Sequence, residues 1–101
     1  MVAEALAAAA DAERAADEAR DSQLDFCKQQ SIGAERTMKA RQLGVAMSAV
    51  MEAAAKVGPS YMRFVRDAYA TPQFRVPDAQ EQVIREFRDD TYRRCLDEQG
   101  I

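Results

Sequence analysis

Residues 2–30, with the sequence VAEALAAAADAERAADEARDSQLDFCKQQ, decide the fold of this chain. The stretch contains neither Gly nor Pro, and Ala, the strongest helix former, dominates its first half. Small and apolar residues recur at alternating steps of four and three, as in the seam of a coiled coil. The seam consists of Ala5, Ala9, Ala12, Ala16, Ala19, Gln23 and Phe26. We predict a long first helix that packs along an antiparallel neighbour and ends near residues 31–33, with Gly33 after its last turn.

The same spacing continues from about residue 34 and predicts a second helix. Its apolar positions are Leu43, Met47, Val50, Ala54, Val57 and Tyr61. Gly58-Pro59 interrupts this helix, because proline lacks an amide proton and disfavours helical geometry at the preceding residue. Two outcomes follow: one helix over residues 34–70 with a kink at this site, or a turn followed by a separate helix over residues 59–70. We expect the kinked helix.

The remaining sequence predicts an extended connection and one more helix. Residues 71–77 contain Pro72 and Pro77, so this segment cannot be helical throughout. A helix follows from Asp78, a suitable N-cap with Glu81 three residues later, and Gly100 closes it. The predicted fold is therefore all-α, a single domain over residues 1–101 built as an antiparallel up-down-up bundle of three long helices.

The two cysteines, Cys27 and Cys95, test this topology. In an up-down-up bundle the first and last helices are parallel, which brings both cysteines to the same end and predicts a disulfide. A full reversal at Gly58-Pro59 would instead place them at opposite ends of the bundle. The alternative is a pair of buried free thiols. A disulfide implies the periplasm or the cell exterior, whereas reduced thiols imply the cytoplasm.

Composition excludes several classes of function. The chain has 101 residues, no His, 17 acids and 14 bases. Without His there is no imidazole base to activate a serine, and the common zinc and iron sites lose a principal ligand. The acidic stripe of Asp17, Asp21 and Asp25 is therefore expected to be a solvated helix face. We expect no catalysis, no cofactor and no metal, and no apolar segment reaches the ~20 residues that membrane insertion needs.

Charge is distributed unevenly along the chain. Residues 1–30 contain seven acids and three bases, residues 31–77 three acids and seven bases, and residues 78–101 seven acids and four bases. The net charges are therefore −4, +4 and −3, which favours a basic middle element packed against two acidic ones. The overall charge of −3 argues against a nucleic-acid partner.

The segment from residue 61 to residue 75 is the candidate for partner binding. It combines aromatic and arginine side chains, the types that dominate protein interfaces, and it ends in a proline-bounded loop. The candidate residues are Tyr61, Arg63, Phe64, Arg66, Tyr69, Phe74 and Arg75. The alternative is that these aromatic rings fill the core while the arginines reach solvent.

Together these patterns favour a non-enzymatic binding protein. The abundance of Ala and the preference for Arg over Lys suggest a bacterial source. We expect a small periplasmic or extracellular helical protein that engages a protein partner, such as an inhibitor, an immunity-type protein or an accessory of an envelope complex. The alternative is a cytosolic coiled-coil adaptor or chaperone that dimerises through its Ala-rich seam. Homodimerisation is left open, and the identity of the partner is not encoded in any motif.

Overall fold

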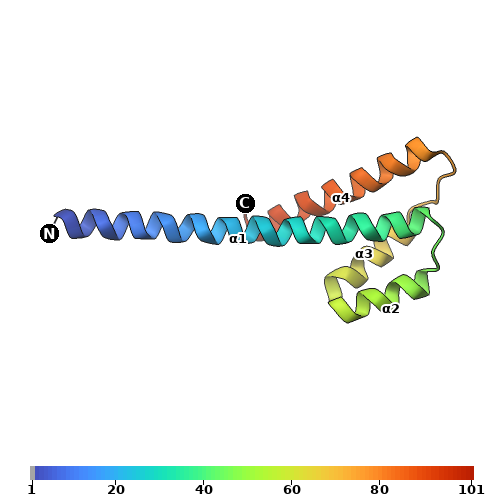
Figure 1. The fold of residues 1–101 in the computed structure, drawn as a ribbon, viewed down its shortest axis with the longest axis horizontal. Helices are drawn as coiled ribbons and strands as arrows, with labels where there is room; N and C mark the ends of the chain where they lie inside the picture. Colours follow the sequence, from blue (N-terminus) through green and yellow to red (C-terminus); the bar gives the residue numbers. More distant parts are fainter. Residues whose placement is uncertain (1) are drawn as a thin grey trace.

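The computed structural model describes residues 2–101, and these form four helices joined by short connections (Figure 1). The helices are α1 (Val2–Gln42), α2 (Met47–Val57), α3 (Pro59–Tyr69) and α4 (Pro77–Gln99). Successive helices run in opposite directions (Figure 1). Helix α1 packs against both α3 and α4. The all-α prediction is confirmed. The predicted three-helix, up-down-up arrangement is wrong, because the middle of the chain folds as two helices.

The first helix is longer than predicted. Helix α1 does not end at Gly33 but continues to Gln42. Gly33 is instead buried inside the helix, where a Cβ atom would overlap the ring of Tyr61. The turn that terminates the helix contains Gly44, whose φ of +79° suits glycine best. The Gly44 amide donates to the Arg41 carbonyl and the next amide donates to the Ala40 carbonyl, which is the Schellman pattern of helix termination.

Gly58-Pro59 separates two short helices, so the predicted kink in one long helix is wrong. Gly58 has a φ of +148° and takes the chain out of α2, and Pro59 occupies the first turn of α3, where its missing amide proton costs nothing. Figure 1 shows α2 and α3 as a hairpin of antiparallel helices beside the second half of α1.

The predicted disulfide is present, although the topology behind its prediction was wrong. Helix α4 begins after Val76, with Pro77 rather than Asp78 in its first position, and returns antiparallel along α1. Because α1 extends to Gln42, Cys27 lies in the middle of this helix rather than near its end. The returning α4 therefore places Cys95 next to Cys27, with 5.4 Å between their Cα atoms.

The core lies where the second half of α1 meets α3 and α4. Its fully buried large side chains are Met38, Val65 and Cys27, and Ala34 and Ala68 are also completely covered. These small alanines let the helix axes approach closely. The core is narrow, which fits the shortage of large apolar residues in the sequence.

The first half of α1 extends beyond this core as a single free helix, here called the arm (residues 2–22). Every residue of the arm is exposed, so the Ala seam predicted to pack within the chain is not covered by it. Helix α4 ends beside Gln23, the residue after the arm, whose side-chain amide donates to the Gln99 carbonyl over 3.4 Å. The radius of gyration is 18.8 Å, well above the ~13 Å of a compact domain of this size.

Two ion pairs join α3 to α4, and one of them has the predicted sense. Arg63 of the basic segment lies 4.0 Å from Glu98 of the acidic one, whereas Arg94 of α4 lies 3.6 Å from Asp67 of α3 with the charges reversed. Within residues 2–101, no ion pair joins the acidic arm to the basic middle segment. The arm points away from that segment (Figure 1), so its acids face solvent.

Candidate functional site

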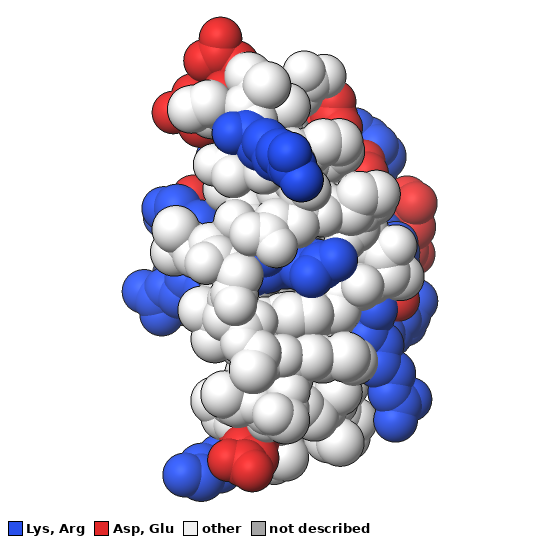
Figure 2. Space-filling model, turned by 90° about the vertical axis from the view of Figure 1, so that its right-hand side faces the viewer, with Lys and Arg blue, Asp and Glu red and all other residues white. Residues whose placement is uncertain are grey.

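Two loops meet at one end of the molecule, here called the loop end: residues 43–46 between α1 and α2, and residues 70–76 between α3 and α4. Half of the exposed large apolar side chains of the described chain gather at this end. They are Leu43, Val45, Met47, Phe74 and Val76. Leu43 is 79% exposed and Val76 is 60% exposed. Figure 2 faces this end and shows a largely uncharged surface with a few separate charges. A cluster of exposed apolar residues on a small protein indicates a binding surface.

The buried side chain of Gln42, the last residue of α1, holds the 70–76 loop against the helix end from which the 43–46 loop leaves. Its Nε2 donates to the Pro72 carbonyl over 3.0 Å, and its Oε1 accepts the Phe74 amide over 2.8 Å. Gln73 reciprocates, because its Nε2 donates to the backbone carbonyl of Gln42 over 3.1 Å. Gln42 is only 3% exposed, so these bonds are shielded from water. The loop that carries Phe74 and Val76 is therefore fixed to the last turn of α1.

Tyr69 and Arg41 fix the other loop. The Tyr69 hydroxyl donates to the Val45 carbonyl over 2.6 Å, and the Arg41 guanidinium lies 5.3 Å from the centre of the Tyr69 ring. The Arg41 Nε also donates to the Thr71 carbonyl over 3.0 Å. Desolvation raises the pKa of the Tyr69 phenol above its ordinary value, although Arg41 opposes this rise. At neutral pH the hydroxyl therefore keeps the proton that it donates.

The structure divides the residues predicted for partner binding into two groups. Tyr69 and the exposed Phe74 and Arg75 belong to the loop end. Tyr61, Arg63 and Phe64 lie near the beginning of α3 instead. Arg66 is exposed between the two groups. The assignment of the seven residues to partner binding stays a prediction, and their positions favour the loop-end group for it.

The group near the beginning of α3 has structural contacts. The Tyr61 ring covers Gly33, and its hydroxyl donates to the Gln29 carbonyl over 3.4 Å. The Tyr61 and Phe64 rings are tilted against each other with 5.4 Å between their centres. Phe64 is buried. These two aromatic rings therefore stabilise the contact between α1 and α3.

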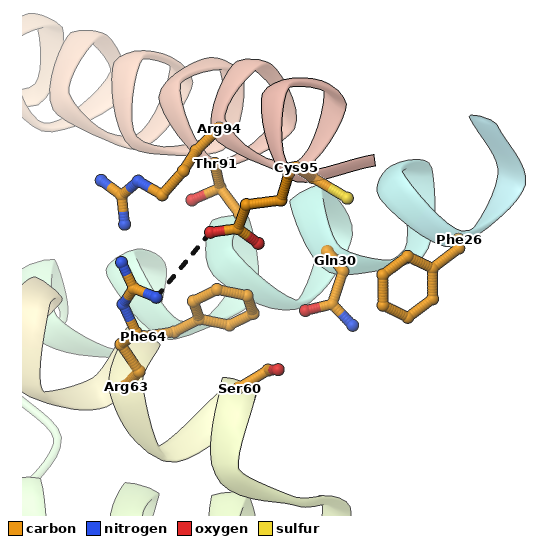
Figure 3. A pocket seen from close by; sticks show the side chains of 9 residues that line it. Phe26, Gln30, Ser60, Arg63, Phe64, Thr91, Arg94 and Cys95 are labelled. Atoms are coloured by element: carbon orange, nitrogen blue, oxygen red, sulfur yellow. Dashed lines mark ion pairs between the residues drawn. The ribbon is translucent and has the colours of Figure 1, made fainter. Parts of the chain in front are cut away.

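A small pocket lies between α1, α3 and α4 beside this group (Figure 3). Its volume is about 60 Å³, which accommodates a few water molecules rather than a substrate. The Arg63–Glu98 ion pair, drawn as a dashed line in Figure 3, joins two of the side chains that line it. The pocket also borders Cys95, whose sulfur is already bonded to Cys27. The pocket is therefore a small gap in the packing of the three helices.

Sequence reasoning missed four of the five loop-end side chains and the residue that positions them. Leu43 and Met47 were assigned to the apolar face of a continuous helix, and Val45 and Val76 were given no role in binding. Gln42 carried no signal, because a glutamine inside a helical pattern is ordinarily a solvated residue. The sequence feature that could have indicated this loop is Gly44, whose positive φ lies in the turn after α1.

Comparison with known protein families, with curated proteins and with solved structures gives no match for this chain. In residues 2–101, no three His, Cys, Asp or Glu side chains gather in a way that could hold a metal ion. No helix in the described part of the chain is long and apolar enough to cross a membrane. The exposed apolar residues of the loop end are therefore the feature of the described chain that bears most on function.

Proposed function

We propose that the protein is a non-enzymatic binding protein that engages a protein partner through the loop end. The observation that carries this proposal is the cluster of five exposed apolar side chains, four on two loops that internal hydrogen bonds hold in place and one, Met47, at the start of α2. A surface that is already ordered loses little conformational entropy on binding, so less of the free energy gained by burying its apolar area is lost to ordering. Arg75 beside Phe74 adds the residue type most enriched at such interfaces.

The disulfide supports an oxidising compartment for this function. Cys27 and Cys95 are both buried and joined across 68 residues of sequence. Such bridges persist in the bacterial periplasm and outside the cell. We therefore propose an inhibitor, an immunity-type protein or an accessory of an envelope complex. A cytosolic adaptor that dimerises through its Ala-rich seam is the second candidate, and the exposed arm favours its dimerisation but the disulfide disfavours its compartment.

Leu43→Ser tests the loop end, and Leu6→Ser, which removes a similarly exposed leucine, is its matched control. Leu43 and Leu6 are both strongly exposed, at 79% and 67%, and lie at opposite ends of α1. We expect immobilised Leu43→Ser protein to capture about tenfold less partner from envelope extract than the unmodified protein, because one anchor is lost. Leu6→Ser protein should capture the unmodified amount.

Both substitutions remove an exposed side chain, so the helical circular dichroism signal should be unchanged in each variant. Equal capture by the two variants would remove the loop end from the proposal. Recovery of the protein with two free thiols from its native source would contradict the oxidising compartment and favour the cytosolic candidate.

A further inference from the structure

An apolar groove separates α1 from α2. It has a volume of about 350 Å³ and lies along the second half of α1. Ile32 contributes to it from α1, and Val50, Ala53 and Val57 contribute from α2. Val57 is 63% exposed, and Gln29 and Arg36 of α1 also line the groove. Nothing within the described chain fills this space.

The arm provides a helix of the right shape for such a groove. Residues seven apart lie on nearly the same side of an α-helix. Ala8, Ala15 and Ser22 therefore lie on the same side of α1 as Gln29 and Arg36, which border the groove. The arm presents small side chains on this side, and these let a second helix approach closely.

We propose that the occupant is a second copy of this chain, with the two α1 helices antiparallel around a twofold axis near Ser22. Ser22 is the midpoint of α1, so this pairing lays each arm along the groove-bearing half of its partner. In this register Ala15 faces Gln29 of the partner subunit, and Ala8 faces Arg36 of the partner subunit. The two contacts are equivalent, as twofold symmetry requires.

Charge complementarity supports this register. Residues 2–22 contain six acids and two bases, a net charge of −4, whereas residues 23–42 contain two acids and four bases, a net charge of +2. Antiparallel pairing of the whole helices sets the acidic half of each against the basic half of the other. Asp11 is brought near Arg36 of the partner subunit, and Glu4 near Lys39 of the partner subunit. Pairing of the arms alone would oppose two charges of −4 and is disfavoured.

The contact is large enough for a stable dimer. Each arm is about 31 Å long and about 10 Å across. Two arms seated in two grooves bury on the order of 1,200 Å² in total, which reaches the range of specific interfaces. The paired length ends at Gln42, so the loops 43–46 and 70–76 lie beyond it, at the far ends of the two α1 helices. The inference rests on the groove and the arm and not on the proposed partner site.

Ser22→Cys tests the axis directly. Ser22 is exposed, and in the dimer it faces its own copy, so mild oxidation should join two chains into a species of twice 11.2 kDa on a non-reducing gel. Asp21→Cys is the matched control, because position 21 is equally exposed but lies on another side of the helix. It should remain monomeric on the same gel.

Analytical ultracentrifugation of the unmodified protein should give the dimer mass at low salt, and this mass should decrease as salt screens the paired charges. Ala15→Glu should yield the monomer, whereas Ala10→Glu, which adds the same charge elsewhere on the exposed arm, should keep the dimer. A monomer at every concentration, or equal cross-linking of Ser22→Cys and Asp21→Cys, would overturn the proposal.

Discussion

Replacement of both cysteines, in the variant Cys27→Ala/Cys95→Ala, is expected to lower the free energy of unfolding by about 4 kcal/mol. The disulfide closes a loop of 68 residues and so restricts the unfolded chain strongly. A domain of this size is stable by only about 5–15 kcal/mol, and this one has a narrow core. The bridge therefore supplies a large share of the stability.

Urea unfolding followed by circular dichroism measures this loss. Addition of a phosphine reductant should destabilise the unmodified protein by a similar amount and leave the double variant unchanged. Because the bridge ties the last turns of α4 to the middle of α1, amide hydrogen exchange in α4 should accelerate in the variant. An unchanged urea midpoint would contradict the role that we assign to the disulfide.

Gln42→Met is expected to cost about 3 kcal/mol, the second large effect. Methionine preserves the length of the side chain but removes its hydrogen bonds, which leaves the Pro72 carbonyl and the Phe74 amide without their side-chain partner in a partly buried site. Each group left unpaired there costs about 1–3 kcal/mol. The loop that carries Phe74 and Val76 is expected to become mobile, and the amide of Phe74 to exchange its hydrogen faster.

Gln82→Met provides the control, since Gln82 is exposed and bonds only to the exposed Glu86. It should change the free energy of unfolding by less than about 0.5 kcal/mol. If the two methionine variants unfold at the same urea concentration, Gln42 does not hold the 70–76 loop against the end of α1. Loss of stability without faster exchange at Phe74 would also contradict the specific contact.

Local sequence signals predicted the helices better than their ends. The Ala-rich stretch and Gly100 act through local backbone chemistry, and the structure follows them at the start of α1 and the end of α4. Gly33 misled the prediction because a glycine in a helical sequence pattern has two possible roles. It can end the helix, or it can stay within the helix and let a neighbouring side chain approach closely. At Gly33 the neighbour is Tyr61, which is distant in the sequence.

The disulfide was predicted correctly through two errors that compensate. The first helix is longer than predicted, and the chain reverses at Gly58-Pro59 instead of bending. Each error alone would separate Cys27 from Cys95, and together they bring the cysteines into contact. The Ala seam shows a related limit, because periodicity identifies an apolar face of a helix but not what covers it.

Of the candidate site, the sequence revealed the part that follows α3. Phe74 and Arg75 were recognised through residue type and the neighbouring prolines. Leu43 and Met47 matched a helical spacing as well as any core residue did. Their exposure depends on where α1 ends and where α2 begins, and both are properties of the folded chain.

Photo-cross-linking at the loop end tests the central claim, that the protein binds its partner there, most directly. A benzophenone amino acid replaces Leu43 in one variant, Val76 in a second and the exposed Arg85 of α4 in a third. Irradiation in the native compartment, followed by mass spectrometry, should give the same partner protein from positions 43 and 76 and none from position 85. An adduct from position 85 alone, or equal adducts from all three positions, would contradict the account.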